Sequence, residues 1–429
     1  MRLHRPWIGI ASLVCCWFAV QHARADNWPQ WRGARFDGVS LETGLPAEWN
    51  KASGKNIAWR LALPGPAGAT PVVWQDHLFL TSVDGSDLVL IAADTSGKQL
   101  WKKTVGSGNK NVRGDEGNSA SPSPATDGKH VWTMMGTGVL ACYDFAGNQI
   151  WKIDLQKKYG QFLIQHGFSS SPVLDGDRLY LQLIHSGGAK IVCLDKATGE
   201  QVWMQRRKTD ARDECQESYA TPTIYRDQHQ ALLLTHGGDY IIAHRLSDGE
   251  EVWRCGGLNP KGQYNNSLRL VASPLAVPGI IIVPSAKNGP VMALRPDGHG
   301  DITNDAQTHY WTHPHNTPDV PSPLVYDGLA YLCRENGNLY CFDVRTGEQY
   351  YEHRTHPDRH RASPLYADGK IYLASRDGTV TVVKAGRQYE ELASNTMGED
   401  ISASPIVADG TLYLRTFEAL YAIRAPRKR

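Results

Sequence analysis

The apolar positions of this chain fall in short runs and do not follow a helical spacing. Runs rich in Val, Ile, Leu and Tyr alternate with Gly or Asp-Gly turns, as in "SPVLDGDRLYL" at 171–181. Such runs, bounded by turn residues, are typical of β-strands. No segment sustains the period of an amphipathic helix. The pattern therefore predicts antiparallel sheets joined by tight turns.

A Ser/Thr-Pro pair opens a unit of this kind eight times, at spacings of 41 to 53 residues. The prolines are Pro71, Pro124, Pro172, Pro222, Pro274, Pro323, Pro364 and Pro405. One four-stranded unit cannot bury both of its faces, so repetition at this period indicates a propeller. We predict an all-β fold, an eight-bladed β-propeller of four-stranded antiparallel blades.

The two ends of the chain together complete the last blade. The eighth unit ends one strand short, and "SGKNIAWRLAL" at 53–63 carries an extra strand ahead of the first unit. We predict that residues 55–63 form the outer strand of the last blade, because pairing would hide two sheet edges. The propeller then spans 55–429 and follows a lead-in segment at 26–54.

An aromatic residue recurs on the outer strand of most units, a few residues after a Gly turn. An indole there can fill the gap between blades and donate its N–H. The predicted blade-docking residues are Trp59, Trp101, Trp151, Trp203, Trp253, Trp311 and Tyr351. In the seventh unit Glu390 stands where we expect the aromatic, so that joint is predicted to be the weakest.

The first 25 residues have the features of a secretory signal peptide. Arg2 and Arg5 precede an apolar run, and "ARA" at 23–25 offers the small residues of a cleavage site. Cleavage near Ala25 predicts a periplasmic or secreted protein with no membrane span in the mature chain. An uncleaved anchor, or a lipoprotein cut before Cys15 or Cys16, is the alternative.

Charge and cysteine content narrow the class of partner. Lys and Arg total 45 and Asp and Glu total 44, which leaves no electrostatic footprint for nucleic acid. Disulfides are permitted in an exported chain, but the pairing of its six remaining cysteines is not readable. Cys142, Cys193 and Cys341 share one repeat position, which favours small apolar strand residues.

The phrase "LDKATGEQVW" at 194–203 resembles the pyrroloquinoline quinone (PQQ) repeat of quinoprotein dehydrogenases and of the outer-membrane assembly factor BamB. The resemblance covers residues 55–424. "NWPQWRGARFDGVS" at 27–40 and "LRPDGHGDIT" at 294–303 resemble the lead-in and an insertion hairpin of exported PQQ-like propellers. The repeat itself is structural, so it implies the fold and not the cofactor.

The resemblance also implies what an enzyme of this kind would need. Quinoprotein alcohol dehydrogenases hold PQQ under a disulfide of adjacent cysteines, beside a calcium ion and a basic Asp. Adjacent cysteines occur here only at Cys15 and Cys16. We therefore expect no catalytic residues, no metal and no cofactor. PQQ with calcium belongs only to the alternative, an alcohol dehydrogenase that could act on polyvinyl alcohol.

Two histidine groups and one acidic loop have the composition of metal sites, but solvated loops explain them better. They are His309, His313 and His315; His353, His356 and His360; and Asp297, Asp301 and Asp305.

The residues just before each Ser/Thr-Pro pair enter the innermost strands and should surround the channel mouth, where propellers bind ligands. The predicted ligand-binding residues are Asn118, His166, Glu217, Tyr219, Arg269, His360, Arg361, Glu399 and Asp400. Ordinary solvation of short loops is the alternative for them. A carbohydrate-active enzyme would require paired carboxylates, with Glu217 and Asp400 as candidates.

The sequence thus predicts an exported, monomeric binding or scaffold module without catalysis. Its partner would be an envelope or exported protein, or a small polar ligand.

Overall fold

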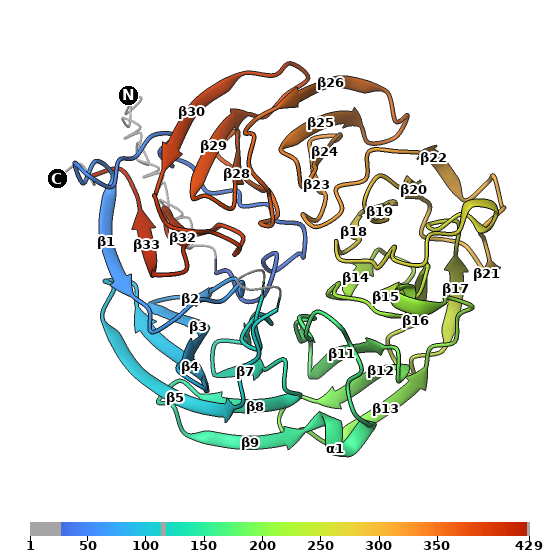
Figure 1. Ribbon diagram of the computed structural model, residues 1–429, viewed down its shortest axis with the longest axis horizontal. Coiled ribbons are helices and arrows are strands. Elements are labelled where there is room, and N and C mark those ends of the chain that lie inside the picture. The colour runs from blue at the N-terminus through green and yellow to red at the C-terminus, as the bar shows by residue number, and fades with distance from the viewer. Residues whose placement is uncertain (1–26, 113–116, 427–429) are drawn as a thin grey trace, which may run out of the picture.

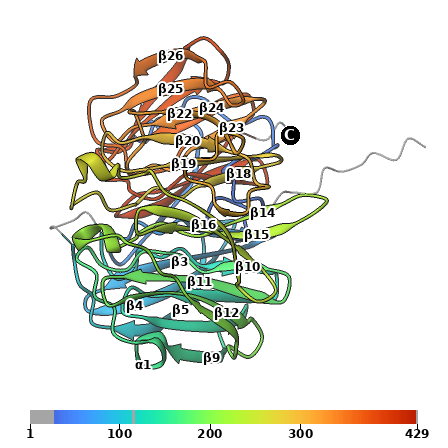
Figure 2. The ribbon, with the colours of Figure 1, turned by 90° about the vertical axis from the view of Figure 1, so that its right-hand side faces the viewer.

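Eight sheets surround a central axis in the computed structural model, which describes residues 27–112 and 117–426. Figure 1 looks down that axis and shows one blade following another around the ring; Figure 2 shows the ring from the side. The predicted signal peptide lies outside the described residues. The all-β, eight-bladed fold is confirmed.

Blades 1 to 4 follow the order of the sequence. Blade 1 holds β2 (Val72–Trp74), β3 (His77–Asp84), β4 (Asp87–Asp94) and β5 (Gln99–Ser107). Blade 2 holds β6 (Ala125–Thr126), β7 (His130–Met134), β8 (Val139–Asp144) and β9 (Gln149–Asp154). Blade 3 holds β10 (Val173–Asp175), β11 (Arg178–His185), β12 (Gly188–Asp195) and β13 (Gln201–Arg206). Blade 4 holds β14 (Thr223–Arg226), β15 (Ala231–Gly237), β16 (Tyr240–Arg245) and β17 (Glu251–Cys255).

Blades 5 to 8 complete the ring. Blade 5 holds β18 (Leu275–Val277), β19 (Ile280–Pro284), β20 (Val291–Leu294) and β22 (His309–His313). Blade 6 holds β23 (Leu324–Tyr326), β24 (Leu329–Cys333), β25 (Asn338–Asp343) and β26 (Gln349–Arg354). Blade 7 holds β27 (Leu365–Ala367), β28 (Lys370–Ala374), β29 (Thr379–Lys384) and β30 (Glu391–Thr396). Blade 8 holds β31 (Ile406–Ala408), β32 (Thr411–Arg415), β33 (Ala419–Ile423) and β1 (Ile57–Ala62).

Three short helices and one extra strand complete the secondary structure of the described residues. The helices are α1 (Leu155–Tyr159) and the 3₁₀ turns at Asp213–Gln216 and Lys261–Gln263. The extra strand, β21 (Gly300–Asp301), pairs in parallel with β17 at the outer edge of blade 4. It belongs to the segment that the sequence marked as an insertion.

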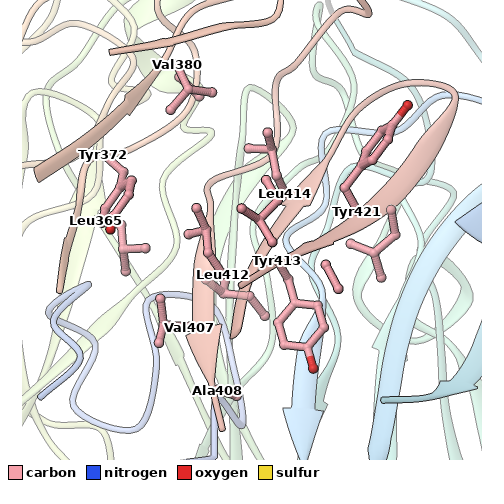
Figure 3. Packing of buried hydrophobic residues seen from close by; sticks show 14 of the residues in the cluster. Leu365, Tyr372, Val380, Val407, Ala408, Leu412, Tyr413, Leu414 and Tyr421 are labelled. Carbon is pink, nitrogen blue, oxygen red and sulfur yellow. The ribbon is translucent and has the colours of Figure 1, made fainter. Parts of the chain in front are cut away.

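The N-terminal strand closes the ring as predicted. β1 pairs antiparallel with β33, with Leu61 opposite Leu420. Buried side chains of blades 7 and 8 form one apolar cluster, in which Tyr372 and Leu365 face Leu412 and Tyr413 (Figure 3). Blade 8 is therefore complete only when strands from both ends of the sequence have met.

The recurring tryptophans link each blade to the next one. Trp203 donates its indole N–H to the carbonyl of Leu246, which lies in a turn of the following blade. Gly249 in that turn has φ +74, and a Cβ there would lie 2.5 Å from the Trp203 ring. Glycine is thus required both by the backbone and by the indole. Equivalent bonds run from Trp59 to Thr95, Trp101 to Phe145, Trp151 to Lys196, Trp253 to Pro296 and Trp311 to Val344. Tyr351 contacts Tyr389 in the next blade, and among the described residues its hydroxyl has no hydrogen-bond partner.

The sequence predicted the wrong residue for the blade-docking position of blade 7. Ala393 pairs with Val382 just before a bulge, as Trp203 pairs with Cys193 in blade 3, so Ala393 and not Glu390 occupies the tryptophan position. The space is filled from the lead-in. Trp49 stacks on Tyr372 at 6.4 Å between ring centroids and donates to Met397 Sδ. A residue outside the repeats therefore completes this joint.

Replacing Trp49 by alanine should lower the free energy of unfolding by about 3–5 kcal/mol, because a buried indole leaves a cavity that the blades cannot close. Urea denaturation followed by circular dichroism measures the loss. Leu41→Ala on the same segment is the control, since Leu41 is 60% exposed and should change stability by less than about 0.5 kcal/mol. Equal effects of the two variants would contradict the role given to Trp49.

The lead-in crosses the middle of the ring (Figure 1, dark blue). Its backbone hydrogen-bonds the innermost strands: Trp28 with Val73 of blade 1, and Gly38 and Ser40 with Tyr366 of blade 7. Further bonds join Pro29 to Thr126, Gln30 to Leu174, and Glu42 to Asp409 and Gly410. The segment therefore covers one end of the central channel.

Candidate functional site

The Ser/Thr residues of the Ser/Thr-Pro pairs form a hydrogen-bonded ring around the channel. The backbone N–H of seven of the eight donates to the hydroxyl of the counterpart in the next blade, at 2.8–3.0 Å. We call Thr70, Ser123, Ser171, Thr221, Ser273, Ser322, Ser363 and Ser404 the hydroxyl ring. Seven such bonds run from Thr70 to Ser404 in one direction. The ring ties the innermost strands of the blades together.

The hydroxyl ring lines a cavity of about 640 Å³. Its residues are at most 9% exposed, yet all eight border this cavity. In the part of the chain that the structure describes, none of the seven hydroxyls that accept these bonds donates its own proton to another protein group. A hydroxyl carries one donor and two acceptor positions. The ring therefore presents hydrogen-bond donors toward the channel axis.

The floor of the cavity comes from the lead-in. Trp31 borders the cavity, and Arg32 beside it is fully buried. The Arg32 guanidinium donates to the carbonyls of Pro364 at 2.7 Å, Pro323 and Asp37. Burial lowers the pKa of Arg32 to about 10, although Asp37 acts to raise it. Because the lead-in lies beyond the ring along the innermost strands, residues 27–112 and 117–426 form the channel as a cup with one open mouth.

The rim of the cup holds two groups of charged side chains. Glu214 accepts from Arg269 at 2.8 Å and lies 3.3 Å from His166 Nε2. On the other side Arg361 lies 3.1 Å from Glu335. Burial raises the pKa of Glu335, and nearby Asp319 raises it further, against the effect of Arg361. Lys287 and Arg359 also border the cavity. The rim thus offers both donors and acceptors.

Four of the nine predicted channel residues border the cavity: His166, Tyr219, Arg269 and Arg361. Tyr219 donates to Glu217 at 2.6 Å, and burial together with this bond raises the pKa of Tyr219. Glu217 itself is 3% exposed and also accepts from the backbone of Gln165. Its position behind Tyr219 makes it a support for the wall of the cup.

The other predicted residues do not border the cavity. Asn118 is buried and donates to the carbonyl of Pro66. His360 is fully buried, its Nδ1 lies 3.1 Å from the carbonyl of Asp358, and burial lowers its pKa to about 4. Asp400 lies 3.4 Å from Arg376, and neither Asp400 nor Glu217 borders the cavity. A ligand-binding role for these residues stays a prediction.

Glu399 fastens the lead-in to blade 8. Its carboxylate accepts from Lys51, Thr416 and Tyr421 at 2.5–2.6 Å. Burial acts to raise the pKa of Glu399, but the bonds from these three side chains hold it below its ordinary value. The carboxylate is therefore charged and structural.

Sequence reasoning missed the floor, the ring and half of the rim. Trp31 lies in the segment that resembles other lead-ins, and the Ser/Thr-Pro pairs indicated only the number of blades. Their strict recurrence as Ser or Thr was a usable signal, since packing alone does not demand a hydroxyl. Glu214 and Glu335 lie in a 3₁₀ turn and a hairpin turn, where the repeat provides no signal.

The donor set at the cup does not fit a calcium-bound quinone. The rim carboxylates Glu214 and Glu335 each lie beside an arginine, whose charge opposes a divalent cation. The described cysteines are all free and buried, and none borders the cavity. Across residues 27–112 and 117–426 no group of three or more His, Cys, Asp or Glu side chains gathers in a metal-binding arrangement.

Eight four-stranded blades, a tryptophan at most joints and a closing N-terminal strand define a PQQ-type β-propeller. A family model described as outer membrane protein assembly factor BamB matches residues 39–140, 136–385 and 305–429. The chain belongs to this family.

Individual relatives agree with that assignment. Outer membrane protein assembly factor BamB of Yersinia pestis is 26% identical over 270 residues, which are 61% of this chain and 62% of that protein. The chain thus spans less than two thirds of this curated relative. The structure of BamB from Moraxella catarrhalis has a TM-score of 0.62 at 15% identity, covering 87% of this chain and 98% of that one. A europium-containing methanol dehydrogenase has a TM-score of 0.69 at 12% identity, covering 92% and 90%. These two structures share the fold.

Proposed function

We propose that this protein is an exported, non-catalytic binding module that receives a small polar ligand in the cup. The observation that carries the proposal is the hydroxyl ring, whose buried O–H donors face the cavity of the cup. Clefts of about 300–1,000 Å³ are the usual size of small-molecule sites. The rim carboxylates are held in ion pairs, which suits positioning better than proton transfer.

A second candidate is a scaffold for an envelope protein, favoured by the name of the Yersinia relative, an outer membrane protein assembly factor. Both candidates place the protein in the periplasm or outside the cell. We also propose that the signal peptide ends at residue 25, that the lead-in ends at residue 54 and that the protein is a monomer. Among the described residues no helix is long and apolar enough to cross a membrane.

Site-specific cross-linking distinguishes these functions. A photoreactive residue replaces Val320 at the cup wall in one variant and Ile150 on the outer strand of blade 2 in another. In living cells the small-ligand function predicts no protein adduct from position 320, whereas a protein inserted at the mouth predicts one from 320 and not from 150. Adducts from both positions would indicate nonspecific contact.

Calorimetric titration with PQQ and calcium, followed by dye-linked alcohol oxidation, tests the alternative of a quinoprotein alcohol dehydrogenase. We expect neither saturable heat nor turnover. Saturable binding with turnover would overturn the non-catalytic function.

A further inference from the structure

A second buried guanidinium lies behind the hydroxyl ring, at the joint between blades 8 and 1. Arg415 is fully buried at the end of β32 and donates through Nη1 to the carbonyl of Ala69 at 2.9 Å. Ala69 immediately precedes Thr70 of the ring. Arg415 Nε and Nη2 have no hydrogen-bond partner in the part of the chain that the structure describes.

The charge of Arg415 is not balanced by the protein nearby. Burial lowers the pKa of Arg415 to about 9, and no carboxylate acts to raise it. A buried charge without a partner is costly, so its retention calls for an explanation. At the other blades the same strand position carries neutral residues such as Thr81 and Gln182, which bond the next blade without adding charge.

The floor adds to this positive charge. Arg32 is satisfied by backbone carbonyls, and Asp37, the acid closest to it, also pairs with Arg35 at 2.9 Å. Around the rim, four cationic side chains border the cavity against three carboxylates. Arg415 and Arg32 do not border the cavity, but the donors of the ring together with this excess of positive charge around the cup favour an anion inside it.

The floor and the rim of the cup have different chemistry from the hydroxyl ring. Trp31 on the floor is the one tryptophan among the described residues that borders the cavity, and an indole offers an apolar face on which the C–H groups of a sugar ring can pack. The Glu214–Arg269 and Glu335–Arg361 pairs offer adjacent acceptors and donors, which match the neighbouring hydroxyls of a polyol. A cavity of about 640 Å³ has room for more than one sugar ring.

We infer that the cup binds an anionic sugar, with its acidic group in the hydroxyl ring and its polyol part against Trp31 and the rim pairs. The inference rests on the proposed function as a ligand-binding module and names its ligand class. A carboxylate and a sulfate ester share the same oxyanion chemistry, and the experiment distinguishes them.

Isothermal titration of the purified mature protein with trigalacturonate, a sulfated disaccharide and neutral maltotriose tests the inference. We expect saturable binding of an anionic sugar, at least tenfold tighter than maltotriose and weakened by salt. Inorganic sulfate alone should bind at least tenfold more weakly than the sugar. Equal affinity for neutral and anionic sugars, or for sulfate alone, would overturn the inference.

Two variants separate a binding role from a structural one. Arg415→Met should weaken the anionic sugar at least tenfold, while the ligand-free protein melts at the same or a higher temperature because an unpaired buried charge is gone. Trp31→Ala should weaken the sugar but leave affinity for inorganic sulfate unchanged. Val202→Ala, on the outer strand of blade 3, is the control and should change neither. Unchanged sugar affinity in Arg415→Met would refute the place given to the anion.

The two proposals fail separately. Suppose that no sugar binds but a screen of polar metabolites finds a ligand whose affinity depends on the hydroxyl ring. The anionic-sugar inference is then refuted, while the proposed ligand-binding function is supported. If no polar ligand binds and cross-links form at position 320, both the ligand-binding module and its sugar are refuted.

Discussion

Replacing Arg32 by methionine should lower the free energy of unfolding by about 3 kcal/mol. The variant leaves the carbonyls of Asp37, Pro323 and Pro364 buried without their donor, and each unsatisfied group costs about 1–3 kcal/mol. Methionine is neutral, so the variant avoids the cost of burying the guanidinium charge, and this offsets part of the loss. Chemical denaturation of the purified protein measures the change.

Arg35→Met is the matched control, three residues along the same segment. Its guanidinium is half-exposed and pairs with Asp37 at the surface, so its loss should cost less than about 1 kcal/mol. If Arg32→Met is no more harmful than Arg35→Met, the lead-in does not hold the blades as described. The opposite expectation for Arg415→Met follows from the same reasoning, because two of the nitrogens in that guanidinium have no partner.

Stability should fall steeply as the pH is lowered from about 6.5 to 4. Burial lowers the pKa of His236 to about 3, and that of His244 and His360 to about 4. Below the unfolded value near 6.5 the unfolded chain binds protons that the folded chain refuses, so folding loses free energy as protons are added. Each histidine contributes about 1.4 kcal/mol per pH unit, and the three together about 4.

Urea unfolding at pH 7.5, 6.5, 5.5 and 4.5 gives this slope. His236→Asn should reduce it by about one proton, since an amide can keep the bond that His236 makes to the carbonyl of Ala272. His229→Asn on the exposed surface should leave the slope unchanged. A flat profile, or the same slope in all three proteins, would mean that these histidines are charged inside the folded protein.

The blade count was predictable because each blade repeats the same local contacts. A Ser/Thr-Pro pair opens each inner strand, where its hydroxyl accepts from the previous blade, as Ser273 does from Thr221. The turn before the outer strand carries a glycine on which the tryptophan of the previous blade packs, as Trp151 packs on Gly199 and Trp203 on Gly249. These requirements act between neighbouring repeats and so leave a periodic trace. Trp49 left none, because its partner Met397 lies 348 residues away.

The candidate site was only partly predictable. Counting back from each Ser/Thr-Pro pair located His166, Tyr219, Arg269 and Arg361, because these positions lead into the innermost strands. The same count selected Glu399, which bonds Lys51 of the lead-in instead of facing the channel. Trp31 and Arg32 reach the axis by a path outside the repeat, so periodicity holds no information about them.

The closing strand sets the order of events in folding. Arg60 of β1 donates to Tyr421 of β33, a partner 361 residues later in the chain. Contacts this distant in sequence form slowly, because closing the long loop between them costs conformational entropy before the contacts can stabilise the fold. The last blade cannot form until nearly the whole polypeptide has been synthesised. The other seven blades each take their four inner-to-outer strands from one continuous stretch of sequence, so closure of the ring comes last.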